Sequence, residues 1–530
     1  MRSKSEIYPD YSAELEALRN SGITKELLER IIRKHQPNAN YNQNLYERYQ
    51  CLDTCVPIFN RSPRYSDSGE PINNKINNDF FGKIIDFKTG YFAGKPITYG
   101  YSFTEESEDM TGGEEFVDEA SKALSDFVTR NSMYDKDMEM TKHASTYGYV
   151  GRLFYVDKER NERCAIFPGF ETIVLSDTNL AEPEFAVRYY RTTDIDDKEV
   201  WKVEFYDNKY IYYWEGALNN LAESKPPKLH LFDYCPLQII VNNDEMLGDA
   251  EKVLSLIDDY DRSLSDNAND IEAFSQAYMV FENVILKDEE MQKAQSSGAI
   301  QFNTGPNGGK VYYLTKDVND AFSEHHLDRL ESQIYYLSET PNMKDDSFGT
   351  ASGIALKFKI LGFEAKCGRF QAKVDVAGQY MFKVLGSSWA HRGIAFDPLQ
   401  AYLDYNPNFP RDLVGEAQGV QALINAGYPK RAAFEELSFV DDVDYIMDLI
   451  EEEKGGIAPL EGEEPEEMTK LNGVQTTLVL NAVAKVQSGE YTLEEAIDMI
   501  RRATGMSEQE VRNMTIMKRI LPDEVLEGVE

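Results

Sequence analysis

Cysteine is scarce in this 530-residue chain, and its five copies lack the CxxC spacing of a zinc site or redox motif. An odd number of scattered cysteines also argues against a disulfide framework and suits a reducing compartment. No apolar run reaches the length of a membrane-spanning helix, and the N-terminal sequence MRSKSEIYPDYSAEL has no apolar core of a signal peptide. We therefore expect neither secretion nor membrane insertion.

Positive charge is also in short supply. Lysine and arginine number 55 against 92 aspartates and glutamates, and the formal net charge is −37. Proteins that grip nucleic acid through its phosphates need basic surfaces, so this balance disfavours a general DNA-binding protein. Two interpretations remain open: an ordinary acidic cytosolic protein, or a surface past which a polyanion moves without adhering.

Catalytic motifs such as GxSxG, HExxH or a Cys/His arrangement are missing as well. The segment around residue 305 resembles a phosphate-binding loop. However, Thr304 stands where that loop needs its first glycine, and Val311 stands where it needs a serine or threonine. A hairpin turn fits better, formed by Gly305, Pro306, Asn307, Gly308, Gly309 and Lys310. His325 and His326 are adjacent on an expected helix and point about 100° apart, which makes a poor metal pair. We expect no catalytic residue, metal or cofactor.

The chain does have apolar residues for several cores, at 42% of its length, and its length suggests three or four domain-sized units. Two helices divided at Gln36–Asn40 are predicted near the N-terminus, and a third over Asn73–Lys88. From about Val150 to Glu215, runs that alternate at period two predict a meandering antiparallel sheet. Ser224–Lys228 contains two prolines and is expected to be a linker.

Two helices with short strands between them follow. An apolar seam of the first helix is predicted at Val253, Ile257, Tyr260, Leu264, Ala268, Ile271 and Phe274. Its opposite face is acidic and carries Asp249, Glu251, Asp258, Asp259, Asp261, Asp266, Asp270 and Glu272. The second helix has its seam at Leu327, Leu330, Ile334 and Leu337. A small β insertion therefore sits on two helices that leave and return together.

The longest helix pattern runs from Gly353 to Trp389. Its apolar stripe extends over about eight turns and comprises Leu356, Ile360, Phe363, Cys367, Phe370, Val374, Ala377, Met381 and Val384. A second stripe of Ile354, Phe358, Leu361 and Ala365 predicts burial on more than one side. The polar segment Asn342–Ser352 lies directly before this helix. A long buried helix headed by a polar loop is typical of a large assembly rather than of a compact enzyme.

The C-terminal part begins with helices from about Leu413 to Glu453. Glu451–Glu467 is a solvated acidic linker rich in glycine and proline. The tail beyond it is again helical, and Thr492 with Glu495 forms an expected capping box.

Several sequence blocks, in this order, resemble the portal proteins of long-tailed bacteriophages, in the branch that infects Gram-positive bacteria. They are LYERYQ, NNKINNDFFGKIIDFKTGYFAGKPITY, TYGYVGRLFYVDKE, FAVRYY, CPLQIIVNNDEMLGDAEKVLSLIDDYDRSLSDNANDIEAF, SETPNMKDDSFGTASGIALKFKILGFEAKCGRF and FVDDVDYIMDLIEEE. Together they span nearly the whole chain.

The resemblance implies an α+β portal fold assembled as a ring. The implied parts are N-terminal helices (1–50), an α+β wing with antiparallel strands (51–247), a stem helix (248–278), a clip (279–320), a second stem helix (321–341), a tunnel loop (342–352), a long wing helix with return strands (353–412), crown helices (413–453), the acidic linker (454–468) and a helical extension of the crown (469–530).

The resemblance also implies functional residues. Those expected to face DNA in the tunnel loop are Asn342, Met343, Lys344, Asp345, Asp346, Ser347, Phe348 and Gly349. Candidates for an acidic channel lining are Asp258, Asp259, Asp261, Asp266 and Asp270, which would offer phosphates no strong partner.

The partners implied by the resemblance are eleven further copies in a twelve-fold ring, double-stranded DNA without sequence specificity, terminase, major capsid and scaffolding proteins and a head-completion adaptor. The implied location is a vertex of the virion capsid, after assembly in the host cytoplasm.

Two rival classes of function stay open, a metal-dependent hydrolase and a monomeric acidic adaptor. Metal content and activity would reveal the first, and mass in solution the second.

Overall fold

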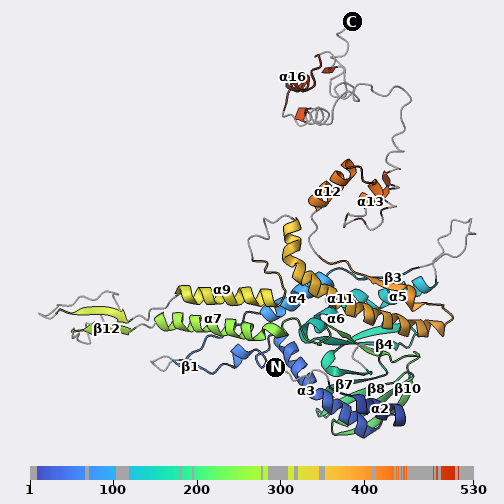
Figure 1. Ribbon diagram of the computed structural model, residues 1–530. Helices are drawn as coiled ribbons and strands as arrows, with labels where there is room; N and C mark the ends of the chain where they lie inside the picture. Colours follow the sequence, from blue (N-terminus) through green and yellow to red (C-terminus); the bar gives the residue numbers. More distant parts are fainter. Residues whose placement is uncertain are drawn as a thin grey trace, which may run out of the picture. The chain divides into compact units, whose positions relative to one another are not determined.

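The computed structural model describes residues 9–65, 71–102, 119–177, 182–193, 196–275, 278–283, 308–314, 320–344, 353–408 and 413–434, with 437, 440, 443, 446–447, 449–450, 482, 485–486, 491–507 and 511–512. The chain divides into two compact units, Met1–Arg411 and Asp412–Glu530, and mixes helices with antiparallel sheets (Figure 1). This mixture confirms the α+β class.

The helices of the first unit are α2 (Ser12–Ser21), α3 (Lys25–Tyr49), α4 (Phe80–Phe92), α5 (Glu119–Asn131), α6 (Met133–Tyr147), α7 (Leu254–Ser275), α9 (Asp320–Leu337) and α11 (Gly353–Ala390). Short 3-10 turns lie at Pro57–Asn60, Gly169–Glu171, Glu251–Val253 and Pro398–Gln400.

Its strands are β1 (Arg64–Tyr65), β2 (Pro71–Ile72), β3 (Thr98–Tyr101), β4 (Tyr149–Val156), β5 (Glu162–Pro168), β6 (Thr172–Leu175), β7 (Phe185–Thr193), β8 (Glu199–Tyr206), β9 (Tyr210–Ala217), β10 (Asn220–Leu229), β11 (Leu237–Val241), β12 (Tyr278–Glu282), β13 (Lys310–Leu314) and β14 (Ala401–Asp404).

The two N-terminal helices divide at a different place from the one predicted. The break lies at Gly22, with a φ of +72°, and Thr24 caps the second helix by accepting a hydrogen bond from the Leu27 amide. Helix α3 then continues through Pro37. Neighbouring polar residues on α3, among them His35 and Asn42, are buried, so tertiary packing outweighs the helix-breaking tendency of the proline.

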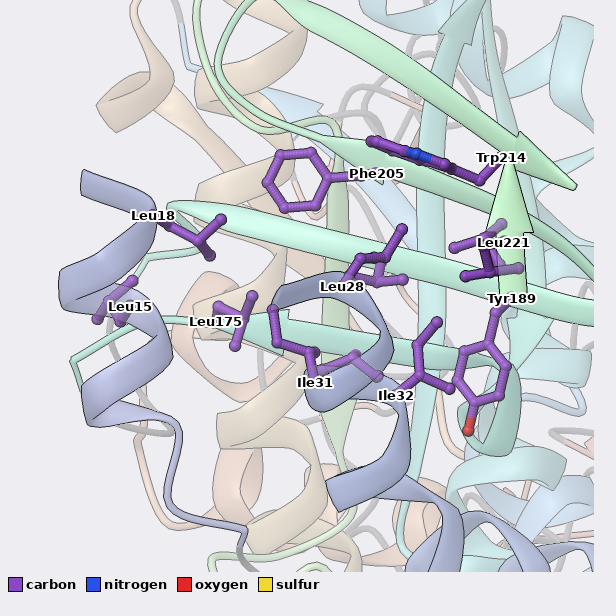
Figure 2. Packing of buried hydrophobic residues seen from close by; sticks show 13 residues of the cluster. Leu15, Leu18, Leu28, Ile31, Ile32, Leu175, Tyr189, Phe205, Trp214 and Leu221 are labelled. Atoms are coloured by element: carbon purple, nitrogen blue, oxygen red, sulfur yellow. The ribbon is translucent and has the colours of Figure 1, made fainter. Parts of the chain in front are cut away.

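These two helices cover one face of a five-stranded antiparallel sheet with the order β10-β9-β8-β7-β6. Their apolar side chains point at the strands (Figure 2), and the buried cluster contains Leu15, Leu18, Leu28, Ile31, Ile32, Ile173, Leu175, Val187, Tyr189, Val203, Phe205, Trp214 and Leu221. The predicted meander over Val150–Glu215 is only partly correct, because β6 to β9 lie in this sheet whereas β4 and β5 belong to a separate sheet with β11.

The expected linker at Ser224–Lys228 is instead part of the edge strand β10. Lys225 pairs with Tyr213 and Lys228 with Ile211, and the register shifts between the two pairs. Proline has no amide hydrogen for a ladder, so Pro226 and Pro227 are accommodated in a bulge on an edge strand, where such residues are tolerated.

The long helix α11 packs on the second layer, a three-stranded sheet of order β11-β4-β5 with α5 and α6. The predicted main stripe of α11 is buried from Ile360 to Val384, and Phe363 and Phe370 are 2% and 0% exposed. The side chain of Leu356 lies outside the described residues.

The second predicted stripe of α11 is not buried within the chain. Phe358 is 74% exposed and Leu361 is 59% exposed, and Ala365 is exposed as well. Helix periodicity identifies apolar positions but cannot tell whether the same chain supplies what covers them. The expectation of burial on more than one side is therefore wrong for a single chain.

Helices α7 and α9 run side by side away from the sheets, and the β12–β13 pair lies at their far end (Figure 1). In the antiparallel β12–β13 ladder, Tyr278 is opposite Leu314 and Glu282 is opposite Lys310. This gives a helical hairpin that carries a small β element, as the sequence predicted. The apolar seams of both helices are only partly correct, because Ile271 on α7 is 71% exposed and Leu337 on α9 is 52% exposed.

A buried cluster of charges, which we call the lysine–aspartate junction, joins this hairpin to the rest of the unit. It consists of Lys88 on α4, Asp249 just before α7, and Lys366 on α11. The Lys88 ammonium lies 3.0 Å from the Asp249 carboxylate and 2.5 Å from the side-chain oxygen of Asn242. It also lies 4.3 Å from the centre of the Phe370 ring.

Lys366 completes the junction from the other side. Its ammonium donates a 2.8 Å hydrogen bond to the Ser338 carbonyl at the end of α9 and lies 3.8 Å from Asp249. Burial alone would raise the pKa of Asp249, but the two ammonium groups outweigh it and hold the pKa below its usual value. Burial lowers the pKa of Lys366.

The second unit is helical where it is described. Its helices are α12 (Leu413–Asn425), α13 (Lys430–Phe434) and α16 (Leu493–Thr504). Helix α16 has the predicted capping box, in which the Thr492 amide donates to Glu495 and the Glu495 amide donates to Thr492. The predicted acidic linker lies outside the described residues.

Truncation of Phe370 to alanine should lower the free energy of unfolding by about 3–5 kcal/mol, because it empties a fully buried site. Leu399→Ala is the control, since Leu399 is 86% exposed, and should change stability by less than about 0.5 kcal/mol. Urea denaturation followed by circular dichroism measures both. Equal losses would contradict the buried position of the stripe.

Replacing Lys88 by methionine should cost about 3–5 kcal/mol, because it leaves a buried carboxylate short of one partner. The comparison is Arg19→Met, which removes surface ion pairs to Asp177 and Glu184; the side chains of Arg19, Asp177 and Glu184 are 44%, 65% and 35% exposed. That loss should stay below about 1 kcal/mol. Melting temperatures that fall by the same amount in both variants would show that the junction is no stronger than a surface pair.

Candidate channel-lining site

The acidic positions on α7 do not all face away from the chain. Asp258 forms an ion pair with Arg48 at 2.5 Å, and Asp266 forms one with Arg61. Asp261 is 2% exposed and accepts a 2.8 Å hydrogen bond from the Asn78 amide. These three carboxylates hold a preceding part of the same chain against the helix.

That part includes an extended segment, residues 73–79, which we call the strap. Alternate amides of the strap donate to side chains one helical turn apart on α7. The Asn74 amide donates to Asn269 at 2.6 Å, the Ile76 amide to Ser265 at 2.9 Å and the Asn78 amide to Asp261 at 2.8 Å.

The two spacings match for a simple geometric reason. Two residues of extended chain advance by about 6.6 Å, and four residues of helix advance by about 6.0 Å. Every second amide of the strap can therefore meet every fourth side chain of α7. The helix predicted over Asn73–Lys88 accordingly begins only at Phe80, after Asp79 as its cap, because the strap satisfies its amides on α7 instead.

Burial raises the pKa of Asp261 to about 6, while the amide hydrogen bonds from Asn78 act in the opposite direction. Because Asp261 is buried by its own chain, it cannot form part of a channel lining, and the sequence-based expectation is wrong for this residue. A signal for this was present in the sequence: Asp261, Ser265 and Asn269 form a polar line at four-residue spacing, opposite the asparagine-rich strap.

The other two acidic candidates are Asp259 and Asp270. Asp259 is half-buried and pairs with Arg262, and its carboxylate lies 3.4 Å from His326 on α9. Asp270 is also half-buried. Of the adjacent pair His325 and His326, His326 therefore links α9 to α7.

The described part of the predicted tunnel loop stays close to α9. The Lys344 amide donates to the Asn342 side chain at 3.0 Å, and its ammonium lies 3.1 Å from Glu331. The hydrogen bond to Glu331 and its charge raise the pKa of Lys344. The Lys344 side chain nevertheless remains 70% exposed, and Met343 is 51% exposed. The expected loop residues Asp345, Asp346, Ser347, Phe348 and Gly349 lie outside the described residues.

The start of this loop is anchored firmly. Ser338 and Thr340 are buried, Ser338 accepts from Lys366, and Glu339 pairs with Arg369 on α11 at 2.7 Å. Of the predicted clip turn, Gly308, Gly309 and Lys310 are described, and Gly308 has a φ of +62° that favours glycine. Gly305, Pro306 and Asn307 lie outside the described residues.

Within the part of the chain that the structure describes, no three His, Cys, Asp or Glu side chains gather as metal ligands would. The same residues include no helix with the length and hydropathy needed to cross a membrane.

Comparison with known proteins identifies the family. The model of the phage portal protein family described as SPP1 Gp6-like matches residues 28–460. The portal protein of Bacillus phage SPP1 is 22% identical over 468 residues, which cover 82% of this chain and 88% of that protein. The portal protein of Clostridium phage phiCD119 is 22% identical over 362 residues, or 64% of this chain and 76% of that protein. The chain therefore belongs to the SPP1 Gp6-like family of phage portal proteins.

Proposed function

We propose that this chain forms a ring, twelve-fold in the virion, around a channel through which double-stranded DNA enters and leaves the capsid. The observation that carries the proposal is the family match over residues 28–460. A helical hairpin that projects from a mixed core and returns into one long helix supports it. The ring is structural, and a separate terminase supplies the energy for DNA movement.

In this proposal the parts of the chain have distinct tasks. The two sheets with α4 to α6 and α11 form the wing, and α2 and α3 are the N-terminal helices. The α7–α9 hairpin forms the stem, and β12–β13 belongs to the clip. Residues 342–352 form the tunnel loop, and residues 413–453 form the crown. The clip side receives terminase during packaging and a head-completion adaptor afterwards, while capsid and scaffolding proteins surround the ring in the host cytoplasm.

The stem would pass DNA by electrostatic repulsion rather than by binding. Asp261 is buried and is excluded, whereas the other four acidic candidates, Asp258, Asp259, Asp266 and Asp270, are half-buried and can contribute to the lining. A wall that presents few free cations gives phosphates no strong partner, and contacts that do form are screened by salt. Lys344 at the loop is the local exception.

Purified protein should have the mass of a ring. Twelve copies of a 60.5-kDa chain correspond to about 0.73 MDa, and a somewhat higher copy number is also compatible with the proposal. Light scattering after size-exclusion chromatography measures the mass, and negative-stain images show the channel. A stable monomer at micromolar concentration would refute the ring and support an acidic adaptor instead.

Substitution Lys344→Ala should leave the ring intact and reduce the number of DNA-filled heads, because it removes the exposed cation at the loop. Glu331→Gln is the matched control. It breaks the same ion pair but keeps the cation, so packaging should continue. Phage complementation with counts of filled heads by electron microscopy gives the readout. If both variants package equally well, Lys344 only anchors the loop to α9.

A further inference from the structure

One apolar face of α11 is left uncovered by the residues that the structure describes. It is exposed, follows helical steps of three and four, and consists of Phe358, Leu361, Gly362, Ala365, Gly368, Ala372 and Val376. We call it the outer face of α11. Phe358, Leu361 and Val376 are 74%, 59% and 57% exposed, which is unusual for three large apolar side chains on one helix face.

The glycines of α11 separate into two groups. A Cβ at Gly378 would lie 2.7 Å from Leu403, and one at Gly386 would lie 3.0 Å from Phe396, so packing within the chain explains both. A Cβ at Gly362 or Gly368 would meet no atom within 4 Å. Glycine destabilises a helix relative to alanine, and no contact with the described residues offsets that cost at these two positions.

Charge indicates what covers this face. Helix α11 carries six lysines and arginines against two acidic residues, in a chain whose net charge is −37. Helices α7 and α9 together carry ten acidic residues against two arginines. Several of these groups form ion pairs within the chain, but the net charges keep opposite signs, 6 − 2 = +4 for α11 and 2 − 10 = −8 for the stem helices. The stem also has exposed apolar side chains of its own, at Ile271, Phe322, Tyr336 and Leu337.

We propose that the outer face of α11 is an interface between copies, and that it receives the α7–α9 stem of a second copy. A closed ring of identical chains needs two different surfaces on each chain, because each copy contacts its two neighbours through opposite sides. The outer face and the stem supply such a pair. Gly362 and Gly368 let the second copy approach the helix backbone closely. The inference rests on the proposed ring and names its contact surface.

The first test is a charge placed in the interface. Leu361→Asp should convert the ring to smaller species, measured by light scattering, while the circular dichroism spectrum stays that of the wild type. Leu229→Asp is the matched control, since Leu229 is 53% exposed on β10, and should leave the ring mass unchanged. A wild-type ring mass in Leu361→Asp would overturn the interface but not the ring. A monomeric wild type would overturn the proposed function itself.

Replacement of Gly368 by alanine gives a second test, which introduces no charge into the interface. Gly368→Ala should raise or preserve the melting temperature of dissociated chains and yet weaken assembly, because the added methyl group obstructs only the second copy. Gly378→Ala should lower the melting temperature. Unchanged assembly in Gly368→Ala would show that no close neighbour lies there.

The identity of the occupant is tested by a photoreactive phenylalanine at position 365. Irradiation of the purified ring should give products of two chains on a denaturing gel, and mass spectrometry should map the crosslink to 254–275 or 320–337. A crosslink within one chain, or to another part of the second copy, would overturn the assignment.

Discussion

The arrangement of the first unit depends on one buried carboxylate shared by two ammonium groups. Asp249 lies where the chain leaves the sheets for α7, Lys88 is on α4, and Lys366 is on the long helix. Each ion was taken out of water at considerable cost, which the other two offset only while all three stay together. The stem and α11 are thereby held to the core as one body.

The acidity of the chain has several physical meanings. On α7, Asp258, Asp261 and Asp266 act as anchors for residues 48–78, through ion pairs and an amide hydrogen bond. Others, such as Asp259, bridge to the neighbouring helix. Net charge alone therefore overstates how much of the acidic surface faces solvent, and the channel wall in our proposal is less negative than the sequence suggests.

The sequence predicted the regular features well because they depend on local periodicity. Alternation gave four strands of the five-stranded sheet, β6 to β9, and steps of three and four gave α9 and the main stripe of α11. Prediction failed where a long-range contact decided the conformation. The strap is extended because its amides reach α7, and Pro37 lies inside α3 because the surrounding polar side chains are buried.

Exposure could not be predicted from the pattern for a related reason. Phe358 and Leu361 have the spacing of core residues, and the chain alone does not cover them. Conversely, the position of Asp261 on the acidic face of α7 predicts a solvated charge, but its side chain is buried. Of the candidate site, the two stem helices were predicted, whereas the burial and the partners of each acidic side chain on α7 were not.

The strap also constrains the order of folding during synthesis. The Asn78 amide donates to Asp261, which lies 183 residues later in the chain. The Asn74 amide donates to Asn269, which lies 195 residues later. Non-local pairings of this kind form late, since a long loop must close first. A ribosome-bound fragment that ends before α7 would carry an unsatisfied polar segment, so the stem cannot acquire its final surroundings until well over half of the first unit has emerged.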